Sequence, residues 1–103
     1  METVYTSGTW QPSPGREEAF VAAWQELADW ASGIPGAGRL SLTRDLHEQG
    51  RYVSFGDWSS DDAVRRWKSL PEFKERMAQV LQHVGEFQSA ELGLVASATG
   101  GHD

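Results

Sequence analysis

The sequence predicts a single α+β domain, and three observations lead to this fold class. Segments rich in β-branched and aromatic residues alternate with segments of helical periodicity, in the order strand, helix, strand, strand, broken helix, strand. The chain has 103 residues, close to the commonest domain size, and can bury its own core. It contains no cysteine, which excludes disulfide bonds, a thiolate nucleophile and cysteine-ligated metal sites. We expect one domain over residues 1–98 and a flexible tail over residues 99–103.

The first half of the chain predicts a strand, a helix and a β-hairpin. Residues 3–11 are rich in Thr, Val, Tyr and Trp, and the prolines of QPSPG end this strand. Gly15 is the expected N-cap of a helix whose apolar residues recur at helical spacing until Gly33. Residues 39–46 alternate apolar and polar side chains, and residues 51–58 follow across the turn HEQG. These two segments are therefore expected to pair as antiparallel strands.

The second half predicts a broken helix and a last strand. Ser59 is the expected N-cap of the helix that follows the hairpin. Pro71 suits the first turn of a new helix, and Ser69 opens an S-x-x-E capping box in front of it. The helix is therefore expected to break and restart. Gly85 is expected to end it, and residues 87–97 form the last strand.

This order of elements predicts a ferredoxin-like βαββαβ fold, a four-stranded antiparallel sheet with its helices on one side. In the third strand, Tyr52 and Trp58 share one parity, while Val53 and Phe55 share the other. Both faces of the sheet thus carry apolar residues, although helices can cover only one. A second copy of the sheet is the expected cover, giving a homodimeric α+β barrel. The sequence does not fix which parity faces the helices.

The charge balance argues against a nucleic-acid partner. Fifteen acidic and nine basic residues give a net charge of −6, and the basic residues do not gather in one run. No basic leader precedes an apolar run, and no stretch approaches the ~20 apolar residues that span a bilayer. We expect a cytoplasmic protein that does not associate with a membrane. The histidines are scattered, so the sequence offers no metal site.

Four segments, PGREEAF, IPGAG, FGDWSS and RRWKSLPEF, resemble the antibiotic biosynthesis monooxygenase family of dimeric α/β barrels. The resemblance runs from about Thr6 to Ser97, and its motifs lie mostly at positions that define the fold. It implies a small enzyme that inserts oxygen into an electron-rich aromatic molecule such as an anthrone, a phenol or a quinol. The family's cofactor-free reaction uses no metal, flavin or haem. The implied partners are therefore an aromatic substrate, dioxygen and a second copy of the chain, with no cofactor.

The resemblance carries over unevenly to individual residues. Trp58 stands where the anthrone-oxidising members have a substrate-contacting tryptophan, but Ser54 replaces their asparagine and Val64 their tyrosine. In the haem-degrading branch, Trp67 matches the tryptophan that presses on the porphyrin. Two further residues of that branch differ, since Met77 replaces the iron-ligating histidine and Gly8 replaces an asparagine.

Three residues are candidates for binding the substrate. Trp58 and Trp67 would stack on its rings, and Tyr52 could turn inward from the third strand to orient it. Each indole also has a purely structural reading. Trp67 has the spacing of a core residue that packs helix on sheet, and Trp58 precedes a helix cap.

Three residues are candidates for catalysis. Ser54 would hydrogen-bond the substrate oxygen, Arg44 would stabilise its anion, and His83 would take the proton. The structural alternatives are an arginine that reaches solvent at a strand end and a solvated histidine at the margin of a helix.

Three functions remain open from the sequence. The first is a cofactor-independent monooxygenase with its pocket between sheet and helices. The second is a non-catalytic dimer that binds a small apolar ligand, which the missing asparagine and histidine favour. The third is a haem-binding or haem-degrading protein, which the absence of the ligating histidine disfavours.

Overall fold

The computed structural model describes residues 3–100, and this part of the chain contains four strands and three helices. In chain order they are β1 (Val4–Pro12), α1 (Glu17–Ala31), β2 (Ala37–Arg44), β3 (Tyr52–Trp58), α2 (Asp61–Ser69), α3 (Pro71–Leu81) and β4 (Val84–Gly93). Of the predicted tail, residues 101–103 lie outside the described residues. No helix in the described range is long and apolar enough to cross a membrane.

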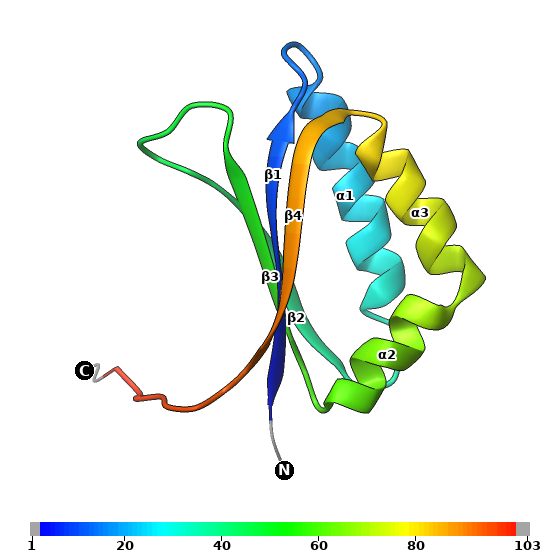
Figure 1. Cartoon of the computed structure of the whole chain (residues 1–103), viewed down its shortest axis with the longest axis vertical. Helices are drawn as coiled ribbons and strands as arrows, with labels where there is room; N and C mark the ends of the chain where they lie inside the picture. Colours follow the sequence, from blue (N-terminus) through cyan, green and yellow to red (C-terminus); the bar gives the residue numbers. More distant parts are fainter. Residues whose placement is uncertain (1–2, 101–103) are drawn as a thin grey trace.

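The four strands form one antiparallel sheet in the order β2-β3-β1-β4. All three helices lie on the same face of this sheet, as Figure 1 shows. The two central strands, β1 and β3, are the first and third in sequence, so each helical segment crosses between strands that are not neighbours in the sheet. This arrangement confirms the predicted ferredoxin-like α+β fold.

The structure settles which parity of β3 faces the helices. The Tyr52 ring lies 5.3 Å from the ring of Phe20 on α1. Trp58 stacks on Trp67 of α2 with 4.6 Å between ring centroids. The even positions of β3 therefore point toward the helices, and Phe55 on the other face is 47% exposed.

The core fills the space between the sheet and the helices in two clusters. One gathers where α2 meets the strand ends and contains Val4, Ala31, Trp58, Ala63, Val64 and Trp67. The other lies between α1, α3 and the middle of the sheet and contains Trp10, Phe20, Trp24, Leu27, Ala28 and Val80. Four of the chain's five tryptophans are thus buried side chains of one layer.

The starts of two helices differ by one residue from the prediction. Helix α1 begins after Arg16, not after Gly15, which lies in the preceding turn with a φ of 83°. Helix α2 is capped by Ser60, not Ser59, because the Ser60 Oγ accepts the backbone N–H of Ala63 at 3.1 Å. Both serines precede the acidic pair of the first turn, so sequence spacing alone does not separate them.

The break between α2 and α3 is present where it was predicted, with a different cap. Leu70 is extended and Pro71 is the first residue of α3. The predicted capping box does not form, because the Ser69 hydroxyl donates to the carbonyl of Arg66 at 2.7 Å. The backbone N–H of Leu70 bonds the carbonyl of Trp67, and that of Phe73 bonds the carbonyl of Leu70, which closes the corner.

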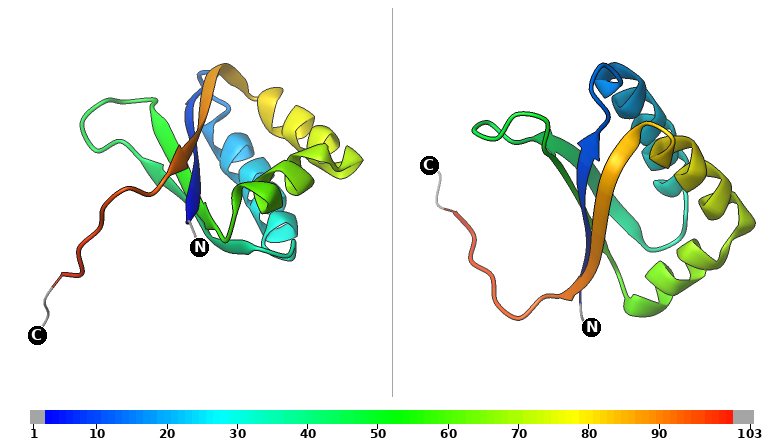
Figure 2. Two further views of the ribbon diagram at one scale, coloured as in Figure 1. Left: turned by 60° about the horizontal axis from the view of Figure 1, so that its bottom comes forward. Right: turned by 45° about the horizontal axis from the view of Figure 1, so that its top comes forward.

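The last helix and strand both lie earlier in the chain than predicted. Helix α3 ends at Leu81, ahead of Gly85, and β4 starts at Val84 and ends at Gly93. Residues 94–100 then leave the sheet on the side away from the helices, as both views in Figure 2 show.

Candidate functional site

A cavity of about 230 Å³ lies between the helices and the centre of the sheet. Its lining residues come from the sheet, from both core clusters and from all three helices. They are Thr6, Ser7, Gly8, Trp10, Trp24, Leu27, Ala28, Ala31, Leu40, Ser54, Phe55, Gly56, Trp67, Lys68, Phe73, Met77, Phe87 and Ser89. Ser7 and Phe55 are among them, although the strand register gives their side chains the open face of the sheet. This volume is just below the ~300–1,000 Å³ typical of small-molecule pockets, so the cavity suits a compact ligand.

Aromatic rings form much of the cavity wall. On the sheet side, Trp10 stacks on Phe87 with 4.1 Å between centroids and 28° between planes. On the helix side, Trp67 meets the edge of Phe73 at 4.8 Å across the helix break. Trp58 supports this wall from behind, since it stacks on Trp67 and is only 1% exposed. A flat aromatic ligand would find stacking and edge contacts on both sides.

Ser54 places one hydroxyl in this apolar wall. It is the buried polar residue at the centre of β3 and is 8% exposed. Its Oγ lies 2.9 Å from the indole Nε1 of Trp10. An indole N–H can only donate, so Ser54 accepts this bond and its own O–H remains to donate to a group in the cavity.

Gly8 gives the cavity access to this hydrogen-bonded pair. It lies directly opposite Ser54 in the β1–β3 register. A Cβ at this position would come within 2.9 Å of Trp10 Nε1 and 3.0 Å of Ser54 Oγ. Any side chain here would therefore cover the hydroxyl that faces the cavity, and glycine leaves it open.

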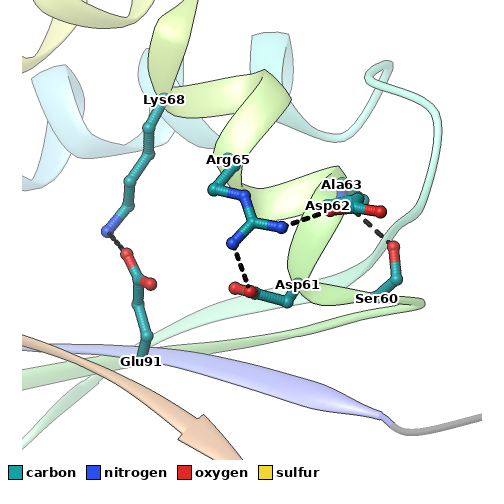
Figure 3. Close-up of polar contacts among 7 residues, drawn as sticks. All are labelled: Ser60, Asp61, Asp62, Ala63, Arg65, Lys68 and Glu91. Carbon is teal, nitrogen blue, oxygen red and sulfur yellow. Dashed lines mark hydrogen bonds and ion pairs between the residues drawn. The ribbon is translucent and has the colours of Figure 1, made fainter.

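Two further polar groups lie on the helix side of the cavity. The Trp67 indole Nε1 is buried and has no hydrogen-bond partner among the described residues. Lys68 lines the cavity, and its Nζ forms an ion pair with Glu91 of β4 at 2.7 Å. Figure 3 shows Lys68 reaching from α2 down to Glu91 on the sheet, apart from the pairing of Arg65 with Asp61 and Asp62.

The structure brings together only part of the predicted site. Ser54 and Trp67 both line the cavity. Trp58 does not reach its surface but holds the Trp67 ring and donates its Nε1–H to Thr6 Oγ1 at 3.3 Å. A substrate contact for Trp58 stays a prediction, and its observed role is to support the wall.

Arg44 and Tyr52 lie together, but at a second hollow beside the β2–β3 hairpin turn. This hollow is lined mostly by polar groups, among them Glu17 and Asp45. Tyr52 faces the helices, which the sequence left open, and packs on Phe20 of α1. The hollow is therefore separate from the aromatic cavity in its lining residues.

His83 lies outside the lining of the cavity. Its Nδ1 is 2.6 Å from a guanidinium nitrogen of Arg16. Because a guanidinium can only donate, Nδ1 is the acceptor and the ring proton of a neutral imidazole is on Nε2. The role of His83 as proton acceptor stays a prediction, and in this structure its ring meets Arg16 and not the cavity.

Three lining residues, Trp10, Lys68 and Phe87, were not among the site residues predicted from the sequence. Trp10 had the pattern of an ordinary packing residue, and Lys68 that of a solvated cation on a polar helix. The spacing of Gly8 and Trp10 was an available signal, because residues two apart on a strand share a face. The cross-strand register that puts Gly8 and Trp10 beside Ser54 could not be read from the sequence.

The sequence was compared with models of protein families and with curated protein sequences. The family model described as antibiotic biosynthesis monooxygenase matches residues 3–79. No curated protein sequence matches the chain.

Two solved structures show the same fold over nearly the whole chain. SnoaB from Streptomyces nogalater, a cofactor-independent oxygenase, is 21% identical with a TM-score of 0.78, covering 96% of this chain and 97% of its own. A Caulobacter crescentus protein, provisionally described as an antibiotic biosynthesis monooxygenase, is 23% identical with a TM-score of 0.82, covering 92% of each chain. At these sequence identities the two solved structures establish only the fold, whereas the family model matches the sequence itself. The chain therefore belongs to the antibiotic biosynthesis monooxygenase family.

Proposed function

We propose that this protein is an oxygenase that oxidises a compact, ionisable aromatic molecule with dioxygen and needs no bound cofactor. The candidate substrates are anthrones, phenols, quinols and related polyketide-like compounds. The observation that carries this proposal is the Ser54 hydroxyl, fixed by Trp10 at 2.9 Å within a cavity of aromatic walls. The family membership and the cofactor-independent oxygenase SnoaB support it.

Ser54 would stabilise the oxygen anion of the substrate. When an anthrone or phenol loses a proton, negative charge develops on its oxygen, and a fixed donor in a dry site favours that charge. Trp10 holds the Ser54 Oγ in place, so little reorganisation is needed when the anion forms. The aromatic walls exclude water and orient the rings.

The reaction balances for an anthrone-type methylene group. The methylene loses a proton to a water molecule, and the resulting anion passes one electron to dioxygen. The carbon radical and superoxide combine into a C–O bond, protonation gives a hydroperoxide, and loss of water leaves a carbonyl. The sum is a CH₂ group plus O₂ giving a C=O group plus H₂O. The substrate supplies the electrons, and the protein binds it, orients it and stabilises its anion.

The donor atoms of the cavity are a poor match for haem. Haem iron is held in proteins by imidazole, thiolate, phenolate or thioether ligands. Among the described residues that line the cavity, the Met77 thioether is the single group of this kind. This lone thioether stands in place of the imidazole that the haem-degrading branch uses, so haem is disfavoured as a ligand of this cavity.

A binding protein without catalysis is the second candidate. It is favoured by the position of His83, which faces Arg16 and not the cavity, leaving the cavity without an imidazole base from the described residues. The same aromatic walls would then serve only to hold a ligand. Oxygen consumption separates the two candidates.

The proposed assembly is a homodimer through the open face of the sheet. Phe55 and Leu92 on this face are 47% and 48% exposed, although they lie on regular strands. The segment after β4 runs out on the same side, and its Val95 is 94% exposed. A second copy would cover these apolar groups.

Substituting Ser54 tests the proposed oxygenase. We expect the wild-type protein to consume oxygen with a panel of anthrones and naphthohydroquinones. Ser54→Ala should lower kcat/KM by about a hundredfold, because it removes one preorganised donor to the anion. The measurement is oxygen uptake with an electrode, with product identified by mass spectrometry.

Ser41→Ala is the matched control, since Ser41 lies on β2 opposite Phe55 and does not line the cavity. It should leave kcat/KM unchanged. Binding of the panel without oxygen uptake above a protein-free sample would reject the oxygenase and favour the binding protein.

A further inference from the structure

The aromatic cavity contains one formal charge at its margin. Among the described residues that line it, Lys68 alone is charged. The other polar side-chain groups of its lining residues are hydroxyls and indole N–H groups, which favour an anion only by hydrogen bonds. The whole chain carries a net charge of −6, so its general field would repel an anionic ligand. A cation at this place would favour an anionic ligand over a neutral one.

The position of Lys68 allows it to serve a ligand. It lies near the end of α2 next to Trp67, whose buried Nε1 has no partner among the described residues. Its Nζ crosses to Glu91, which pairs with Thr6 in the β1–β4 register. Thr6 is itself a lining residue, so the ion pair joins α2 to the sheet beside the cavity (Figure 3).

The Lys68–Glu91 pair is exchangeable. The two side chains are 30% and 43% exposed, and ion pairs at such exposure contribute little to stability. A negatively charged oxygen at the cavity margin could replace the Glu91 carboxylate at small cost. Glu91 would then be a competitor for Lys68 as well as its partner in the free protein.

We propose that Lys68 selects the charge of the ligand. It binds the anionic oxygen of an aromatic ligand, an ionised phenol or a carboxylate, in exchange for Glu91. The cavity accordingly prefers an aromatic anion to a neutral molecule of the same shape. This inference rests on the proposed function in that the cavity is the ligand site.

The test compares two probes of equal shape, 2-naphthoate and 2-naphthamide, by isothermal titration calorimetry. Wild-type protein should bind 2-naphthoate more tightly. Lys68→Met should weaken 2-naphthoate binding by about fivefold and leave 2-naphthamide unchanged, whereas Lys68→Arg should keep the preference. Glu91→Gln should strengthen 2-naphthoate binding, because it removes the competing carboxylate. Raising the salt to about 1 M should reduce the wild-type preference.

Two control variants make the same changes of charge elsewhere. Lys74→Met alters an exposed lysine of α3, and Glu86→Gln alters an exposed residue of β4. Neither residue lines the cavity. Each variant should therefore change the preference for 2-naphthoate over 2-naphthamide only by the small effect of altering the protein's net charge. Thermal unfolding of each variant checks that the fold is kept.

The results that would overturn charge selection by Lys68 differ from those that would reject the oxygenase. Failure of wild-type protein to bind 2-naphthoate, absence of a preference, or an unchanged preference in Lys68→Met overturns the charge selection. Equal losses of melting temperature in Lys68→Met and Glu91→Gln, with unchanged ligand preference, would make the pair a structural clamp only. The oxygen uptake of wild type and Ser54→Ala is measured separately and stands or falls independently.

Discussion

At the scale of single residues, Asp45 shows how one carboxylate organises a turn. Its Oδ1 accepts the backbone N–H groups of His47 and Glu48 at 2.8 and 2.9 Å. Its Oδ2 accepts a guanidinium N–H of Arg51 at 2.8 Å. These donors favour the ionised form, so the backbone bonds first, and then Arg51, lower the pKa of Asp45. The hairpin turn beside the second hollow is therefore stabilised by an ionised side chain.

Replacing Asp45 should make the stability difference depend on pH. Because the folded-state pKa is lowered, the stabilising effect is present above the unfolded pKa of about 3.9 and is lost as the pH falls through the folded value. Asp45→Asn should therefore lower the urea midpoint at pH 7, and the difference from wild type should shrink toward pH 2–3. Glu26→Gln on the exposed surface of α1 is the control and should show no such convergence. A difference that is the same at both pH values would contradict this account.

At the scale of elements, the cap of α2 gives a test between neighbouring serines. Ser60→Ala removes the acceptor of the Ala63 N–H and should lower the free energy of unfolding by about 1 kcal/mol. Ser59→Ala, one residue earlier, removes no cap and should change it by less than about 0.5 kcal/mol. Urea denaturation measures both. Equal losses in the two variants would mean that the cap is shared or has moved.

The elements themselves follow from the sequence more readily than their ends. Strand and helix periodicity, and Pro71 as a first helical residue, were enough to predict the sheet and the broken helix. The predicted start of α2 was wrong by one residue because Ser59 and Ser60 are both good N-cap residues. The predicted start of α1 was wrong by one residue because the sequence does not show that Gly15 has a positive φ.

The uncertain ends and faces of the elements also explain why only some of the predicted site residues line the cavity. His83 was placed by helical geometry, but α3 ends at Leu81, so that geometry does not apply to it. Trp67 lines the cavity as its helical spacing toward the sheet predicts, whereas the face of Ser54 is settled only by the packing of β3 in the structure. Lys68 was missed because its position depends on β4, which is distant in sequence.

At the scale of the whole molecule, the open face of the sheet predicts the state of assembly. Leu92→Asp puts a charge on the face proposed to meet a second copy and should shift the protein to a monomer. Val21→Asp makes the same change of charge at an exposed apolar residue of α1 and should leave a dimer. Light scattering coupled to size exclusion measures both. A monomeric wild type at micromolar concentration would contradict the proposed barrel.

The corner at Leu70 also has a rotational consequence for the cavity wall. Trp67 and Phe73 are six residues apart, and a continuous helix turns by about 100° per residue. In one unbroken helix these two side chains would point about 120° apart. The extended Leu70 resets this phase, so that both rings line one cavity and meet at 4.8 Å. The break thus acts as a phase shift that lets one short stretch of chain supply two adjoining aromatic walls.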